Sequence, residues 1–240
     1  MTHLHLTRRK MLQLGSLSSA SLALAACTTS APPPPIVTAP PPAPSSPDGS
    51  INYALAYGPV FDNGFEVPAV PFQQIDRRFL RQEVANNTGE PEGKVVVDTA
   101  QHFMYFTLPG GRAMRYGVGL GREGFEWSGR GTVKRKAEWP KWHPPAEMID
   151  REPELEKYRT TFNEATGVWE GGMEPGLMNP LGARAHYIFQ GEVDTLYRLH
   201  GSPEWWSIGK SVSSGCVRLM NQDVIDLYNR VPVGAEIIVR

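Results

Sequence analysis

The sequence predicts a mainly β domain with a few helices, built in the style of a sandwich or barrel and preceded by a leader and a linker. From residue 93 onward, short apolar runs alternate with turn residues, a pattern typical of strands. Prolines dominate residues 32–47, so this stretch cannot form a packed core. The 240 residues have a formal net charge of -1, which argues against a nucleic-acid-binding protein.

The first 26 residues have the pattern of an export signal. They contain no Asp or Glu, and Arg8, Arg9 and Lys10 form a basic start. The apolar stretch that follows is too short to cross a bilayer, which takes about 20 residues. We therefore expect a signal peptide over residues 1–26. Its paired arginines resemble a twin-arginine signal.

A cysteine stands directly after this leader. Residues 24–27 read LAAC and resemble a bacterial lipobox, in which Cys27 becomes the acylated first residue of the mature chain. The alternative is a plain secretory signal with an incidental cysteine. Thr28 follows in place of aspartate, which resembles sorting to the outer membrane of a diderm bacterium. We expect a lipid-anchored protein of the cell envelope, in the periplasm at the inner face of the outer membrane.

The segment after the anchor, residues 27–50, is expected to be a spacer. Its prolines favour extended polyproline II, which makes a semi-rigid tether. A proline-rich recognition motif is the rival interpretation. Residues 51–92 give only a weak pattern and are expected to form an N-terminal extension that packs on the domain. Phe72, Ile75 and Phe79 could face one side of a short helix or simply pack along the domain surface.

The folded domain is expected over residues 93–240. Two strands flank the turn at residues 109–111 (PGG) as a hairpin. Asn221 is expected to cap a helix that runs to Arg230. Residues 138–145 and 166–182, rich in Trp, Gly and Pro, are expected to be long loops, and residues 146–162 a helix. The expected strands are 94–98, 102–108, 113–118, 132–137, 185–189, 196–200 and 236–239.

Two residues stand out for chemistry. If Cys27 is acylated, Cys216 is the only thiol of the mature chain, and Gly215 before it permits a sharp turn. His200 lies sixteen positions earlier, after a predicted strand, and a histidine can act as base for a thiol. From the residues alone, a catalytic nucleophile and an inert core cysteine remain equally open.

The stretch around these two residues resembles the L,D-transpeptidase (YkuD) catalytic domain. That family has a His-Gly pair and then Ser/Thr-x-Gly-Cys-(Ile/Val)-Arg, and here these are residues 200–201 (HG) and 213–218 (SSGCVR). The turn at residues 179–182 (NPLG) also fits. The resemblance covers roughly residues 93–240 and implies a YkuD-like β-sandwich or barrel-like domain. Ser214 stands where many members have histidine, which leaves local polarity open.

The resemblance implies a peptidoglycan L,D-transpeptidase. Cys216 would attack the diaminopimelate carbonyl of a tetrapeptide stem, and the thioester would pass to an amine of another stem or of a lipoprotein. His200 would accept and return the proton, with the Gly201 carbonyl orienting its ring. Backbone amides of Ser214, Gly215 and Cys216 are the expected oxyanion hole. No metal and no cofactor is implied.

Other residues have competing interpretations. Arg218 could bind a stem carboxylate, but we favour a brace for the catalytic loop through backbone carbonyls. Trp205 and Trp206 are candidates for substrate contact, with core packing as the alternative. His102, His143 and His186 are expected to be structural or superficial. The competing functions are an L,D-carboxypeptidase or hydrolase of stems, a non-catalytic peptidoglycan-binding module, and a general cysteine protease.

Overall fold

The computed structural model describes residues 51–122, 127–213 and 215–240. The expected signal peptide, Cys27, the proline-rich linker and Ser214 lie outside these residues. No helix in the described part of the chain is long and apolar enough to cross a membrane.

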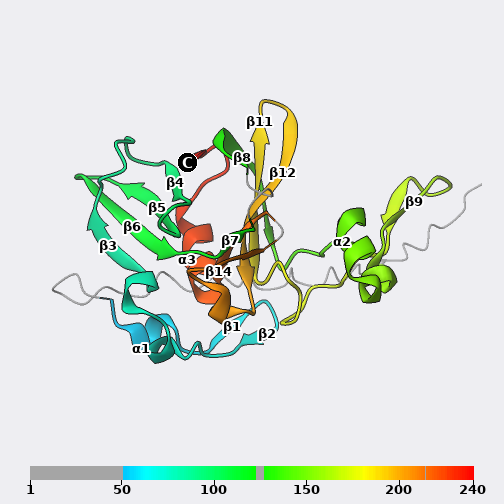
Figure 1. The fold of residues 1–240 in the computed structure, drawn as a ribbon, viewed down its shortest axis with the longest axis horizontal. Coiled ribbons are helices and arrows are strands. Elements are labelled where there is room, and N and C mark those ends of the chain that lie inside the picture. The colour runs from blue at the N-terminus through cyan, green and yellow to red at the C-terminus, as the bar shows by residue number, and fades with distance from the viewer. Residues whose placement is uncertain (1–50, 123–126, 214) are drawn as a thin grey trace, which may run out of the picture. The chain divides into compact units, whose positions relative to one another are not determined.

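A nine-stranded mixed sheet dominates the fold, and its labelled strands can be followed in Figure 1. Its strands follow the order β14-β12-β11-β8-β15-β4-β5-β6-β3. Most neighbours are antiparallel, but β12 pairs with β14 and β15 pairs with β4 in parallel. The predicted mainly β fold with few helices is confirmed. In chain order the strands of this sheet are β3 (Gln82–Ala85), β4 (Val95–Asp98), β5 (Phe103–Leu108), β6 (Arg112–Gly117), β8 (Gly129–Glu138), β11 (Arg184–Gln190), β12 (Val193–Ser202), β14 (Val217–Met220) and β15 (Glu236–Val239).

The main core lies on one face of the sheet, under helix α3 (Asn221–Arg230). Val224 and Leu227 of this helix are fully buried. The predicted helix bounds are confirmed, but the predicted cap is wrong, because Met220 holds the N-cap position. The side chain of Asn221 accepts a hydrogen bond from the Ala183 amide at 2.9 Å instead. It therefore ties the helix to the segment that enters β11.

Residues 51–92 form several short elements around the sheet. Two 3-10 helices stand where a single short helix around Phe72, Ile75 and Phe79 was one of the two expectations. Strand β3 then pairs with β6 as the edge of the large sheet. The elements are α1 (Tyr53–Ala56), the hairpin of β1 (Val60–Asp62) and β2 (Phe65–Val67), η1 (Phe72–Gln74) and η2 (Arg77–Phe79).

Buried ion pairs join this N-terminal segment to the rest of the fold. Arg184 at the start of β11 makes two hydrogen bonds to the Asp62 carboxylate of β1, at 2.6 and 2.7 Å. Trp139 Nε1 donates to the same carboxylate at 2.7 Å. A second buried pair lies at α3, where Arg81 Nη1 is 3.1 Å from Asp226. Buried charges are tolerated only when they are paired in this way.

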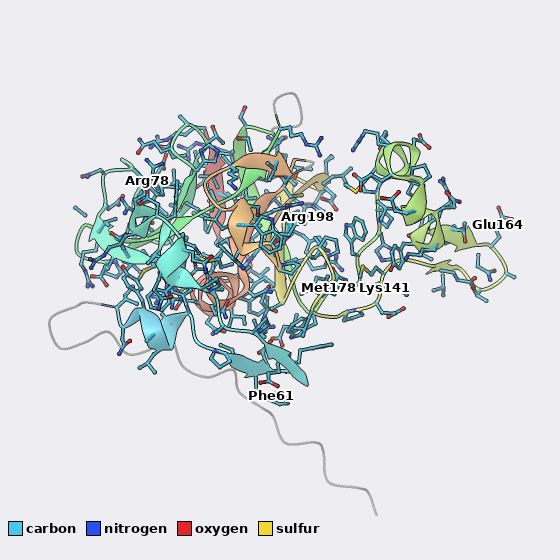
Figure 2. The ribbon with its side chains drawn as sticks, turned by 60° about the horizontal axis from the view of Figure 1, so that its bottom comes forward. Phe61, Arg78, Lys141, Glu164, Met178 and Arg198 are labelled. Atoms are coloured by element: carbon cyan, nitrogen blue, oxygen red, sulfur yellow. The ribbon has the colours of Figure 1, made fainter. Side chains whose placement is uncertain are left out.

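The chain between β8 and β11 leaves the sheet as an excursion, which Figure 1 shows as a separate group around α2 and β9. Figure 2 labels Glu164 at its far end. The predicted helix over 146–162 is too long, because β9 already begins at residue 161. The predicted loop over 166–182 contains a strand, since β10 pairs with β9. The excursion consists of α2 (Ala146–Arg151), η3 (Pro153–Tyr158), β9 (Thr161–Asn163) and β10 (Val168–Glu170).

Candidate active site

Strand β12 contains His200, and the parallel strand β14 begins directly after Cys216. Their register places His200 opposite Arg218 and Leu199 opposite Val217. Leu199 and Val217 are fully buried in the main core. Side chains alternate along a strand, so His200 of β12 and Arg218 of β14 face away from that core. Cys216 lies in the bend directly before β14, next to the strand that pairs with β12.

The ring of His200 is held in one tautomer. Its Nδ1 lies 2.6 Å from the carbonyl oxygen of Gly201. A carbonyl can only accept, so Nδ1 carries the proton and Nε2 keeps its lone pair for use as a base. Burial lowers the pKa of His200 to about 4, against the opposing effect of the Gly201 carbonyl. The ring is therefore neutral at physiological pH, as a general base must be.

The thiol of Cys216 is partly buried and points to a backbone carbonyl. Its Sγ donates to the oxygen of Leu196 at 3.7 Å, and among the described residues no hydrogen bond joins it to the His200 ring. Burial raises the pKa of the Cys216 thiol, while the backbone amide and the charge of Arg198 oppose that shift. Both shifts favour the neutral forms, a thiol at Cys216 and an imidazole at His200.

The turn before Cys216 is fixed on both sides. Ser213 Oγ donates to the Cys216 carbonyl at 2.7 Å. Gly215 has φ +122°, which favours glycine, and any side chain on Gly121 would collide with its backbone. Strand β13 (Ser211–Ser213) pairs here with β7 (Leu120–Gly121). Of the predicted oxyanion-hole donors, the Gly215 amide makes a long 3.4 Å hydrogen bond to Ser213 Oγ.

Arg218 braces the site, but through a side chain. Its Nη1 lies 2.6 Å from Glu204 Oε2, whereas the expected partners were backbone carbonyls. Glu204 belongs to the segment between the predicted base and nucleophile, so the ion pair fastens that segment to β14. The backbone of Arg218 makes two hydrogen bonds with that of Gly119. The Arg218 amide donates at 2.8 Å, and the Arg218 carbonyl accepts at 2.9 Å.

The two predicted tryptophans occupy different environments. They lie in the 3-10 helix η4 (Trp205–Ser207) with their rings edge to face at 5.7 Å. Trp205 is half-buried against the second hydrophobic cluster, which also contains Phe79 and Ile208. Trp206 is 54% exposed. Of the pair, only Trp206 has a large surface free for a ligand.

The remaining histidines lie outside this constellation. His143 is exposed and hydrogen-bonds Thr160 Oγ1 at 2.8 Å, and His102 Nε2 lies 3.1 Å from Ser211 Oγ. His186 is fully buried on β11, and neither of its ring nitrogens has a hydrogen-bond partner in the described part of the chain. Its ring packs against Tyr228 with centroids 5.5 Å apart. These positions agree with structural or superficial roles.

The turn at residues 179–182 lies beside His200. Asn179 is fully buried, and its side-chain amide donates to three backbone carbonyls, including that of Pro140 at 3.1 Å. The carbonyl of Pro180 raises the pKa of His200, although less than burial lowers it. It therefore favours the imidazolium that forms once the ring accepts a proton.

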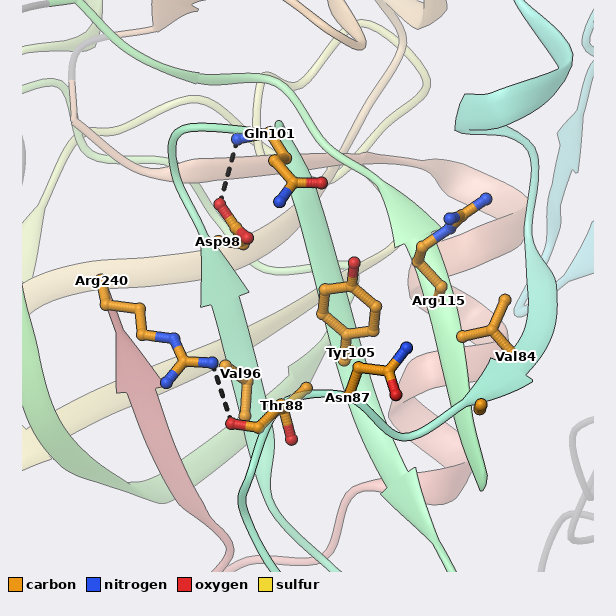
Figure 3. Close-up of a pocket in the computed structure, with 10 residues that line it drawn as sticks. Val84, Asn87, Thr88, Val96, Asp98, Gln101, Tyr105, Arg115 and Arg240 are labelled. Atoms are coloured by element: carbon orange, nitrogen blue, oxygen red, sulfur yellow. Dashed lines mark hydrogen bonds between the residues drawn. The ribbon is translucent and has the colours of Figure 1, made fainter. Parts of the chain in front are cut away.

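The described residues around His200 and Cys216 form no metal site. Over residues 51–122, 127–213 and 215–240, His, Cys, Asp and Glu form no group of three or more that could hold a metal ion. A polar hollow of about 350 Å³ lies at the other end of the sheet, over β4–β6, and Figure 3 shows Tyr105 at its centre. Cys216 and His200 do not line it.

Comparison with known proteins shows the family of the chain. Residues 92–239 match the L,D-transpeptidase catalytic domain family, YkuD, over more than half of the chain. The chain belongs to this family. It is 31% identical over 148 residues to the probable L,D-transpeptidase YbiS of Escherichia coli, and 31% identical over the same length to the probable L,D-transpeptidase ErfK/SrfK of that species. These matches take in 60% of this chain but only 43% and 42% of those relatives.

Solved structures are also similar. A Brucella melitensis crystal structure, titled as a probable carnitine operon oxidoreductase, is 40% identical with a TM-score of 0.45, covering 71% of this chain and 99% of its own. An L,D-transpeptidase from Mycobacterium smegmatis is 21% identical with a TM-score of 0.38, covering 61% and 57%.

Sequence reasoning missed three features of this family member's site. They are the Leu196 carbonyl beside the thiol, the Glu204 partner of Arg218, and the Pro180 carbonyl beside His200. Two of them are backbone atoms, which no residue type signals. The one available hint was Asp194 with Thr195 inside a strand, because such residues commonly hydrogen-bond local backbone.

Proposed function

We propose that this protein is a peptidoglycan L,D-transpeptidase with Cys216 as nucleophile and His200 as base. The Cys216 sulfur attacks the diaminopimelate carbonyl of a tetrapeptide stem while His200 Nε2 takes the thiol proton. The C–N bond to the terminal D-alanine breaks, and the proton leaves with its amine. An acceptor amine then attacks the thioester and releases the thiol.

The observation that carries this proposal is the fixed tautomer of His200. The Gly201 carbonyl at 2.6 Å assigns the proton to Nδ1 and leaves Nε2 free to accept one, and His200 lies on the strand that pairs with β14, which begins directly after Cys216. The carbonyl thus acts as the orienting third member of a triad. Membership of the YkuD family supplies the substrate class, the peptide stems of the cell wall.

Purified protein incubated with disaccharide-tetrapeptides tests the reaction. Mass spectrometry of the products should show loss of D-alanine and formation of a cross-linked dimer. Cys216→Ala should form neither product while keeping its thermal unfolding midpoint. His200→Ala should slow the reaction by at least the ~10²-fold typical of losing a general base. His143→Ala is the matched control. His143 is exposed, so this variant should retain the wild-type rate.

The same spectra separate the alternatives. Free tripeptide without dimers would indicate an L,D-carboxypeptidase, in which water resolves the thioester. Product formed only with an added lysine-ended peptide would indicate attachment of a lipoprotein. Binding without any product, in wild type as in Cys216→Ala, would refute the enzyme and leave a peptidoglycan-binding module.

We also propose a lipid anchor at Cys27, with residues 28–50 as spacer in the cell envelope. About 23 residues of polyproline II at ~3.1 Å each span up to roughly 70 Å, far more than a flexible coil of that length. Cys27→Ser should move the protein from the membrane to the soluble fraction without changing turnover of soluble muropeptides. A Cys27→Ser protein that still sediments entirely with membranes would exclude the anchor.

A further inference from the structure

Strand β12 contains an irregularity directly beside Cys216. Tyr187 of β11 pairs with Arg198, and Phe189 pairs with Asp194. One residue of β11, Ile188, therefore stands opposite the three residues 195–197 of β12. A bulge of this kind re-aims backbone groups and is over-represented next to active sites. We call residues 194–198 the β12 bulge.

Side chains of the bulge hold it in shape. Asp194 accepts the amide of Leu196 at 2.9 Å and makes two hydrogen bonds to the Arg198 guanidinium, at 2.6 and 2.7 Å. Thr195 Oγ1 donates to the Ile188 carbonyl at 2.7 Å. The Arg198 guanidinium also lies over the Tyr187 ring, 4.4 Å from its centroid. Figure 2 labels Arg198 over the sheet. The bulge is thus clamped along its whole length.

The residue at the centre of this clamp has an unfavourable backbone. Leu196 has φ +61°, in the left-handed region that leucine avoids, and its side chain is 75% exposed. No burial of the leucine side chain offsets that cost. A strained backbone that neighbouring groups enforce points to a role for the backbone itself.

The strained turn directs one carbonyl at the proposed nucleophile. Leu196 O is the acceptor 3.7 Å from Cys216 Sγ. The amide of Arg198, at the other end of the bulge, favours the thiolate, so the bulge presents both an acceptor and a donor to this sulfur. The charged groups that influence the pKa of Cys216 are Asp194 and Arg198 of the bulge and Arg218 of β14.

We propose that the β12 bulge is a positioning element that holds the Cys216 thiol, still protonated, against the Leu196 carbonyl until a donor stem binds. This inference rests on Cys216 being the nucleophile of the proposed function. Stem binding turns Sγ from Leu196 O toward His200, and the S–H proton passes to Nε2 as the sulfur–carbon bond forms. In the resting enzyme the same contact limits reaction of the thiol with small electrophiles.

The reactivity of the Cys216 thiol can be measured by alkylating full-length protein with iodoacetamide at pH values from 6 to 10. The rate at each pH is followed by intact-mass measurement. The rate follows the thiolate fraction, so its midpoint reports the pKa of the thiol. Leu196→Ile keeps the charge and the number of side-chain atoms, but a β-branched residue disfavours the left-handed backbone conformation at this position. Leu196→Gly accepts that turn without strain. Losing one hydrogen bond to the neutral thiol should lower the midpoint by about 0.5–1 pH unit in Leu196→Ile. Leu196→Gly should match wild type.

Asp194→Ala removes the clamp and should also lower the midpoint, with its charge loss contributing. Glu156→Gln is the matched control, because Glu156 makes a similar two-bonded pair with Arg159 on the excursion. Thermal unfolding of each variant identifies any loss of fold. Equal midpoints in Leu196→Ile and Leu196→Gly, with both folded, would overturn the proposal.

Turnover of muropeptides provides the second readout. Leu196→Ile should alkylate faster at pH 7 yet transfer stems more slowly, a split that a merely structural role would not produce. Alkylation needs no stem turnover, so the two proposals fail separately. Shifted midpoints in a protein that never processes stems would refute the proposed function and leave the bulge assignment standing.

Discussion

The ion pair between Asp62 and Arg184 allows a quantitative test of how residues 51–92 stabilise the domain. Both side chains are almost fully buried, 4% and 1% exposed. Asp62→Asn keeps the shape and an acceptor for Trp139 but removes the charge opposite Arg184. Breaking a buried pair from one side costs about 3–5 kcal/mol, because the remaining charge is left uncompensated. Glu138, 3.7 Å from Arg184 Nη2, favours the lower end of that range.

We therefore expect Asp62→Asn to lower the free energy of unfolding by about 3 kcal/mol. For a domain of this size that lowers the thermal midpoint by about 6–12 °C. Chemical denaturation and differential scanning calorimetry measure the two quantities. Asp76→Asn is the control, since Asp76 pairs with Arg78 at the surface, where the side chains are 59% and 65% exposed. Its effect should stay within about 0.5 kcal/mol.

Adding Arg184→Met to Asp62→Asn completes the test. If an uncompensated guanidinium causes the loss, removing it should recover most of the stability, because no buried charge remains. A destabilisation below 1 kcal/mol in Asp62→Asn, or a double variant as unstable as the sum of both single variants, would refute the reasoning.

Two further predictions concern His186 of β11 and Gly201 of β12. Burial lowers the pKa of His186 to about 3, so this ring stays neutral in the folded protein while the unfolded chain binds a proton below pH 6.5. Stability should fall as the pH drops through 6.5, by about 2 kcal/mol at pH 5 from this residue alone, and urea unfolding of His186→Phe should show a correspondingly shallower dependence. At Gly201, an added Cβ would overlap Asn221 Oδ1 and lie 2.9 Å from Val224 Cγ1. Gly201→Ala should cost about 1–3 kcal/mol and slow stem turnover, whereas Gly176→Ala, with open space around it, should do neither, and equal unfolding midpoints in the two variants would contradict this.

Much of the central sheet could be predicted from sequence, because its signals are local. The hairpin of β5 and β6 follows from alternating side chains around residues 109–111, and α3 follows from its apolar spacing. The excursion was harder to predict, because β9 and β10 are three residues each, and the contact between Phe162 and Trp169 forms only when the two strands pair. Segments this short have too few residues to show a period.

The sequence by itself determined which residues are candidates for the chemistry. Cys216, the glycine directly before it and a histidine sixteen residues earlier indicated the expected nucleophile, turn and base, since motif residues are read directly from the chain.

Only the tertiary structure decided how those residues are held. The His200 tautomer, the Leu196 carbonyl beside Cys216 and the Glu204 brace on Arg218 depend on strand register and backbone angles. The contact of Asp62 with Arg184 joins positions 122 residues apart. Such contacts form because packing brings distant segments together and burial then makes each unpaired charge or carbonyl costly, and neither effect is visible in local composition.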